Sequence, residues 1–202
     1  MISKTSKQII AAGGTILVLA LMYWGVLAPI RRSQMFVMAT ANLKTVQTLG
    51  EFLSLFEKPI NVASPVGYDE IVAFYLPRIR GIIQENQDPD LIHPLVVEAA
   101  RVSDPIIERG VGLNFSATLL VAGSVYEAAA IQLLDETYYY KAKEIFELGL
   151  QKSPNRLQFL QGMLDLARIS GDEEQMKAVA QKILSIWPEE QSGIEALRDA
   201  SK

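Results

Sequence analysis

The sequence predicts an all-α protein, in which an N-terminal transmembrane helix precedes an array of helical hairpins. Three observations support this fold class. No charged residue occurs from Gln8 to Ile30, and Pro154 and Pro188 stand 34 residues apart, each after an amphipathic run. No alternating, β-branched stretch indicates a strand. An interval of this length is typical of helix-turn-helix units that stack because a single unit cannot bury its apolar face.

Residues 9–30 form the predicted transmembrane helix. As a helix this stretch is about 33 Å long, which is enough to cross the hydrocarbon core of a bilayer. Tyr23 and Trp24 lie near its far end, where interfacial aromatic residues are expected, and Arg31 and Arg32 follow. A cleavable signal peptide is the alternative, but the apolar stretch is long and no small-x-small site stands clearly at its end. We therefore expect a retained anchor that contacts the lipid bilayer through residues 9–30.

The basic residues on the two sides of the anchor favour opposite membrane topologies. Lys4 and Lys7 favour a cytoplasmic N-terminus and an exported soluble part, whereas Arg31, Arg32 and Lys44 favour the reverse. Because a signal anchor behind a short basic tail is a common arrangement, we expect a single-pass protein of the cytoplasmic membrane with an extracytoplasmic soluble part. A cytoplasmic soluble part is the alternative.

Composition limits the classes of ligand. Residues 31–202 carry 17 Lys and Arg against 23 Asp and Glu, with no dense basic stretch. Electrostatic attraction to nucleic acid is therefore not expected, so no nucleic-acid partner is predicted. The chain has no cysteine, and a domain of this size does not need disulfides for stability.

The segment between the anchor and the hairpins is also predicted to be helical. Apolar residues at three- and four-residue steps from Phe36 to Phe56 predict one amphipathic helix that continues from the anchor. A loop is expected over 61–67, and a helix over 68–84 that Pro77 kinks or splits. Further start signals lie at 88–94 and 103–105, and Gly110 and Gly112 interrupt the chain before a long helix from Asn114. The expected divisions are 1–32 for the tail and anchor, 33–112 for a segment packing on the repeats, and 113–202 for the repeats with a C-terminal capping helix after Pro188.

Two successive units fit the 34-residue interval. In the first, over 123–156, large residues stand at Tyr126, Leu133 and Phe146, and small residues stand at Ala129, Ala130, Ala142 and Gly149. In the second, over 157–190, Met176 stands where a small residue is usual and Ala180 where an aromatic residue is usual. Gly171, Asp172 and Gln175 predict a helix-ending turn followed by a capping box. These positions resemble those of the tetratricopeptide repeat (TPR).

A more particular resemblance rests on short motifs. They are Ser153-Pro154-Asn155-Arg156 followed by Gln158, the Gly171-Asp172 turn, and Ser64-Pro65-x-Gly67-x-Asp69-Glu70. They look like the C-terminal TPR tail of bacterial O-antigen ligase or polymerase-type membrane proteins, over residues 30–190. Those enzymes have about a dozen spans, with their glycan chemistry between them, whereas this chain offers one span. The resemblance implies a related helical tail and not catalysis by this chain.

Residues with catalytic chemistry are few. His93 is the only histidine, and without cysteine a zinc site would need carboxylates for all its other ligands, so we expect a solvated or capping histidine and no metal or cofactor. Gly110-x-Gly112 lacks the third glycine and the preceding strand of a dinucleotide fingerprint. Of the aromatic run 138–140, at least one ring should lie in the core. We therefore expect no enzyme; a hydrolase or transferase would need a converging carboxylate pair such as Glu127 and Asp165.

The TPR resemblance implies a concave groove lined by the first helix of each unit. Its positions in this sequence are Ser124, Glu127, Ile131 and Leu134 in the first unit and Gln158, Gln161, Asp165 and Arg168 in the second. This mixture of apolar residues and both charges fits an extended peptide or a helix of another protein, although these positions could also be merely solvent-facing. The leading hypothesis is thus a membrane-anchored TPR-like scaffold that binds another membrane or envelope protein in the bacterial cell envelope. The alternative is an accessory or regulatory portion of an O-antigen or polysaccharide ligase or polymerase system.

Overall fold

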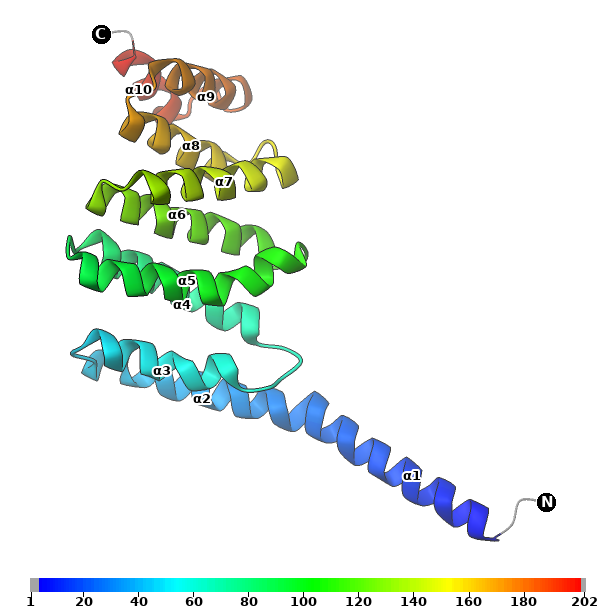
Figure 1. The fold of residues 1–202 in the computed structure, drawn as a ribbon. Coiled ribbons are helices and arrows are strands. Elements are labelled where there is room, and N and C mark those ends of the chain that lie inside the picture. The colour runs from blue at the N-terminus through cyan, green and yellow to red at the C-terminus, as the bar shows by residue number, and fades with distance from the viewer. Residues whose placement is uncertain (1–3, 201–202) are drawn as a thin grey trace. The chain divides into compact units, whose positions relative to one another are not determined.

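The computed structural model describes the backbone of residues 4–200 and the side chains of residues 8–200, and every regular element in that range is a helix (Figure 1). The predicted all-α class is therefore confirmed for the described residues. The chain divides into two compact units, Met1–Ile71 and Val72–Lys202. The predicted divisions at 32 and 112 stay predictions. The side chains of Lys4 and Lys7, used above to argue sidedness, lie outside the described residues.

The first unit begins with one long helix. It consists of α1 (Lys4–Met22), a π-helical stretch (Tyr23–Leu27), α2 (Ala28–Asn42) and a 3₁₀ turn (Leu43–Thr45). Its part from Gln8 to Thr45 is long and apolar enough to cross a membrane, and the apolar side chains from Ile9 to Leu27 are exposed. The predicted continuation of the apolar segment into a following helix is confirmed, whereas its insertion in a bilayer stays a prediction. A second helix, Phe115–Leu133, is also long and apolar enough to cross a membrane, but half of it is buried, as expected for a core helix.

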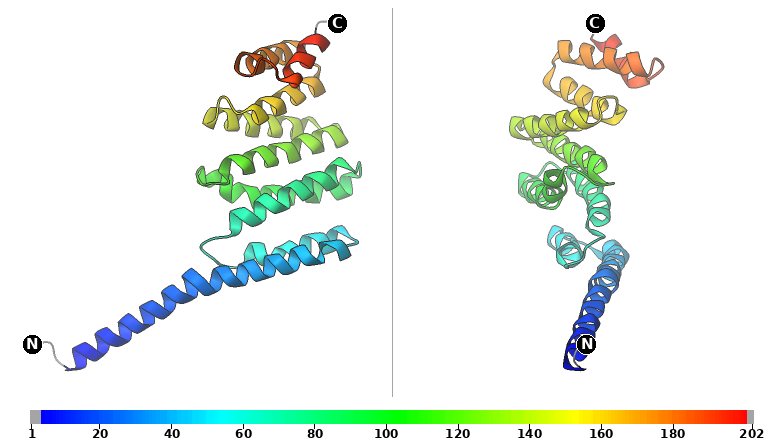
Figure 2. Two further views of the ribbon diagram at one scale, coloured as in Figure 1. Left: turned by 180° about the vertical axis from the view of Figure 1, so that it is seen from behind. Right: turned by 90° about the vertical axis from the view of Figure 1, so that its right-hand side faces the viewer.

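The predicted single helix over 36–56 is wrong. The chain leaves the helical conformation at Val46, and α3 (Leu49–Asn61) begins after Thr48, which has extended backbone angles. The Thr48 hydroxyl accepts a hydrogen bond from the Glu51 amide at 3.2 Å, and a Glu51 carboxylate oxygen accepts one from the Gln47 amide at 2.8 Å. The first bond satisfies an amide in the first turn of α3 and the second holds the residue before the cap, which makes a helix start at this point favourable. The helix α3 packs beside α2 (Figure 2).

Arg32 fixes the loop that follows α3. Its buried guanidinium donates hydrogen bonds to four backbone carbonyls, those of Ile60, Val62, Ser64 and Val66. Gly67 closes the loop with φ of +91°, and a Cβ atom at this position would lie 3.2 Å from Arg32 Cδ. The loop over 62–67 agrees with the predicted one. Arg32, which the sequence presents as a basic residue beside the anchor, satisfies carbonyls at the end of α3 and in the loop.

The second unit is a succession of helices that follow one another as layers (Figure 1). They are α4 (Tyr68–Gln84, which starts in the first unit), α5 (Pro89–Arg109), α6 (Phe115–Leu133), α7 (Glu136–Lys152), α8 (Leu157–Ser170), α9 (Glu173–Ile186) and α10 (Gln191–Asp199). The helices α6 and α7 pack as one hairpin and α8 and α9 as the next, α7 also packs on α8, and α10 packs on α9. Each hairpin turn has a capping residue, because Asp135 accepts from the Thr137 amide at 2.7 Å and Asp172 from the Gln175 amide at 2.9 Å.

A proline expected to kink or split a helix, and another expected to mark a new helix start, both lie inside continuous helices. The helix α4 continues through Pro77, so a split at this proline is wrong, and α5 continues through Pro94 and Pro105, so the predicted start at 103–105 is also wrong. Each proline removes one backbone hydrogen bond. The apolar face of α5 nevertheless stays buried along its whole length, from Ile92 to Ile106. Burial of that face stabilises the continuous helix more than the missing bonds destabilise it.

Glycines allow the hairpins to approach one another around two buried phenylalanine rings. A Cβ atom on Gly123 of α6 would lie 2.4 Å from the Phe146 ring, and one on Gly162 of α8 would lie 2.6 Å from the same ring. A Cβ atom on Gly149 of α7 would lie 2.4 Å from the Phe159 ring. Since real Cβ atoms do not approach so closely, these three positions need glycine in the present packing.

A separate buried cluster closes the C-terminal end. It consists of residues from α8, α9 and α10: Leu160, Leu164, Ala167, Met176, Ala180, Ile183, Ala196 and Ala200. Gly171 ends α8 with φ of +68°, and α9 ends at Ile186, before Trp187 and Pro188, as the sequence predicted. The segment after Pro188 forms α10, and its packing on α9 agrees with the expected terminal helix.

Candidate functional site

A polar cavity of about 240 Å³ lies among α4, α6 and α8. Ser124 and Glu127 reach it from neighbouring turns of α6, and Gln158, Gln161 and Asp165 reach it from one face of α8. Residues three and four apart share one face of a helix, which is why each helix presents several of these side chains together. Five of the positions that the resemblance assigned to a groove therefore line one cavity.

Arg80 of α4 contributes the cation of this cavity. The repeat spacing does not indicate Arg80, because α4 precedes the two units that follow the 34-residue interval. The apolar part of the lining consists of Leu120, Val121, Phe146 and Gly162. Phe146 is thus both the ring on which α6 and α8 pack and part of the cavity wall, so the packing of the hairpins determines the shape of the site.

Glu127 carries the strongest electrostatic perturbation of the site. Burial raises the pKa of its carboxyl group to about 7, with a further upward contribution from the negative charge of Asp165 and an opposing one from Arg80. Burial disfavours the charged form of a carboxyl group, and a like charge nearby has the same effect. Near neutral pH, Glu127 is therefore divided between a neutral form that can donate a hydrogen bond and a charged form that can accept several.

Asp165 and Gln161 connect the cavity to α10. Arg168 donates to Asp165 at 2.8 Å and to the Ser192 carbonyl at 3.5 Å. The Gln161 amide lies 3.2 Å from a Glu190 carboxylate oxygen and 3.4 Å from the Ser192 hydroxyl. Arg168, the last of the predicted groove positions, thus acts here as the partner of Asp165.

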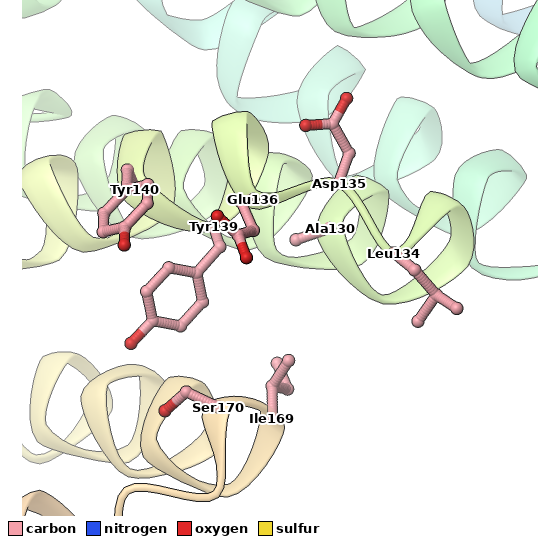
Figure 3. A pocket seen from close by; sticks show the side chains of 8 residues that line it. All are labelled: Ala130, Leu134, Asp135, Glu136, Tyr139, Tyr140, Ile169 and Ser170. Atoms are coloured by element: carbon pink, nitrogen blue, oxygen red, sulfur yellow. The ribbon is translucent and has the colours of Figure 1, made fainter.

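The remaining two predicted positions lie elsewhere on α6. Ile131 is about half exposed, at 46%, and lines neither the polar cavity nor the second cavity described next, which includes Leu134. Leu134, which is 87% exposed, lines a second cavity of about 340 Å³ between the α6–α7 turn and the end of α8 (Figure 3). The structure therefore places five of the predicted positions at the polar cavity and one, Leu134, at the second cavity.

The aromatic run at the start of α7 differs from its prediction. None of Tyr138, Tyr139 and Tyr140 is buried, so the expectation of at least one core ring is wrong. The Tyr138 hydroxyl oxygen lies 2.5 Å from the Nδ1 atom of His93, and the Tyr138 ring contacts the Tyr126 ring. His93 is exposed within the second turn of α5 and does not cap it.

The site places two carboxyl groups in one cavity. Glu127 and Asp165 both line it, which is the geometric requirement stated above for a hydrolase or transferase. Arg168, however, already donates to one of the Asp165 oxygens. Among the residues whose side chains the structure describes, no group of three or more His, Asp or Glu side chains is arranged to hold a metal ion.

No family model, curated protein or solved structure matches the chain.

Proposed function

We propose that this chain is a membrane-anchored scaffold of the TPR type, which binds a segment of another membrane or envelope protein through the cavity of α6 and α8. The observation that carries the proposal is the convergence of Glu127, Gln158, Gln161 and Asp165 on that cavity. Carboxyl and amide groups offer both donors and acceptors, and such groups suit the backbone and polar side chains of a peptide.

The packing of the hairpins supports this proposal. Glycines of α6 and α8 lie against the Phe146 ring, so the two helices that present the polar side chains are held at a short distance. A binding surface built on packed helices keeps its side chains in place before the partner arrives, which reduces the entropic cost of binding.

The anchor supports the membrane part of the proposal. The apolar side chains from Ile9 to Leu27 are exposed, and a bilayer would remove them from water. The soluble part is proposed to lie outside the cytoplasm. A reporter that is active only outside the cytoplasm, fused to the C-terminus, tests the side: activity is expected, and activity of a cytoplasmic reporter alone would contradict this part.

A capture experiment with paired glutamine variants tests the binding proposal. The tagged full-length chain in detergent is incubated with membrane extract, in parallel with Gln158→Arg and Gln181→Arg variants. Gln158 lines the cavity and Gln181 is an exposed residue of α9. We expect a discrete partner that the wild type and the Gln181→Arg variant retain and the Gln158→Arg variant loses. Equal capture by all three chains, or no specific partner for any of them, would count against the proposal.

A further inference from the structure

The second cavity has a distinct chemistry. Its lining is Ala130, Leu134, Asp135, Glu136, Tyr139, Tyr140, Ile169 and Ser170. The residues that line it include two carboxylates and two tyrosine rings and no lysine or arginine. It is a site separate from the polar cavity, and apart from Leu134 none of its lining residues was predicted as a groove position.

Only one of the two carboxylates faces the cavity freely. Asp135 is the capping residue of α7, since one of its carboxylate oxygens accepts from the Thr137 amide, and its side chain points away from α8 (Figure 3). Glu136 points to the side of Tyr139 and α8 (Figure 3). The carboxylate of Glu136 is therefore the one available to a ligand.

Two further features add negative potential at the same place. Ser170 is the last residue of α8, and the C-terminal end of a helix carries a partial negative charge from its free carbonyls. The Tyr139 ring extends toward Ser170 (Figure 3), and the face of an aromatic ring attracts cations. Its neighbour Tyr140 meets it edge-on, with ring centroids 5.3 Å apart, which leaves ring faces available for stacking.

Apolar side chains border this negative centre. Leu134 and Tyr140 are 87% and 62% exposed, and Ile169 lies on the facing end of α8. Leu134 also has φ of +52°, a left-handed conformation that is unfavourable for leucine. A leucine held in this conformation and turned to solvent is available for contact with a partner.

We propose that this cavity binds an arginine side chain of a partner protein, with an apolar residue next to that arginine packing on Leu134. The charge complementarity selects a cation, and arginine fits better than lysine because its planar guanidinium can stack on a tyrosine ring while it donates to Glu136. The proposal uses none of the side chains of the polar cavity. It can therefore hold whether or not the polar cavity binds a partner.

A fluorine NMR titration tests the proposal on the full-length chain in detergent micelles. The chain is labelled with 3-fluorotyrosine, which gives one signal for each of its seven tyrosines, and Tyr139→Phe assigns the relevant signal. The probe is the dipeptide N-acetyl-Arg-Leu-amide, and the matched neutral probe carries citrulline in place of arginine. We expect the arginine probe to shift the Tyr139 signal, and the citrulline probe to bind at least about fivefold more weakly.

Paired glutamate variants identify the carboxylate. Glu136→Gln should weaken binding of the arginine probe by about fivefold, whereas Glu174→Gln, at an exposed position in the first turn of α9, should leave it unchanged. Unchanged signals of the tyrosines outside this cavity show that a variant is folded. The proposal is overturned if the Tyr139 signal does not respond to the arginine probe, if the two probes act equally, or if Glu136→Gln binds like the wild type.

Discussion

Glu127 of α6 and Asp165 of α8 line the same cavity, and the charge of Asp165 contributes to the raised pKa of Glu127. Two hairpins are thus coupled through a pair of like charges at the proposed binding site. A partner that supplies a hydrogen-bond donor or a cation here would relieve that repulsion. Binding through this cavity should consequently respond to pH in the neutral range.

The Glu127 carboxyl group should make stability depend on pH. Its pKa is about 7 in the folded chain against an ordinary value of 4.5, so its contribution is fully present below pH 4.5 and is lost as the pH rises to about 7. Glu127→Gln has no such loss. The free energy of unfolding of this variant, relative to wild type, should increase by at most about 3 kcal/mol between pH 4.5 and 8.

Chemical denaturation of both chains in detergent, followed by far-UV circular dichroism at several pH values, measures this difference. Comparison of the two chains cancels the groups that titrate in both. A difference that is the same at every pH, or that decreases toward pH 8, would show that Glu127 is not perturbed as described.

Substitution of Gly162 by alanine should destabilise the second unit. The new methyl group would lie 2.6 Å from the buried Phe146 ring, so the ring or α8 must move, at a cost of about 1–3 kcal/mol. Gly81→Ala is the matched control, since nothing lies within 4 Å of a Cβ atom at that helical position. The control should gain up to about 1 kcal/mol from helix propensity. Thermal unfolding measures both, and a Gly162→Ala chain as stable as wild type would contradict the packing.

Arg32 should be required for order in the loop over 62–67. Arg32→Lys keeps the charge, but a single ammonium group has three donors and cannot reach the four carbonyls that the guanidinium bonds. We expect a local loss of about 1–3 kcal/mol. Hydrogen exchange of the detergent-solubilised chain should show faster exchange near residue 62, where the Val62 amide bonds Lys58. Arg31→Lys, at the exposed neighbouring position, should exchange like wild type, and equal exchange in the two variants would contradict the role of Arg32.

The left-handed conformation of Leu134 should be measurable as strain. Leu134→Gly and Leu134→Ala both remove the exposed side chain, but only glycine adopts φ of +52° without steric cost. The glycine variant should be more stable than the alanine variant by about 1 kcal/mol. Denaturation of the two variants under one condition tests this, and an alanine variant of equal or higher stability would show that the turn is not strained.

The extent of prediction from sequence depended on how local each signal is. The turn at Gly171 and Asp172 and the stop before Pro188 were predicted because one or two residues determine them. The break before α3 was missed although Thr48 caps the helix and the Glu51 carboxylate accepts from the Gln47 amide, since the apolar periodicity continues on both sides of it. The tendency of proline to interrupt a helix was overestimated. Burial of the apolar face keeps α5 continuous through Pro94 and Pro105, and this burial depends on neighbouring helices.

The site was predicted in part for a similar reason. The repeat spacing selects positions on α6 and α8, and two of these positions, Glu127 and Asp165, line one cavity in the structure. Arg80 comes from a helix that the spacing does not include, and the division between a polar cavity and the cavity at Leu134 depends on the α6–α7 turn. Such relationships between distant residues are not written in any local pattern.

Site-specific photo-crosslinking in living cells tests the central claim most directly. A benzoylphenylalanine residue is placed at Gln158, which lines the polar cavity, or at Lys182, an exposed position of α9. The account predicts that ultraviolet light joins the Gln158 derivative to one discrete membrane or envelope protein and that the Lys182 derivative does not form this product. The same product from both positions, or none from Gln158, would contradict a binding role for the cavity.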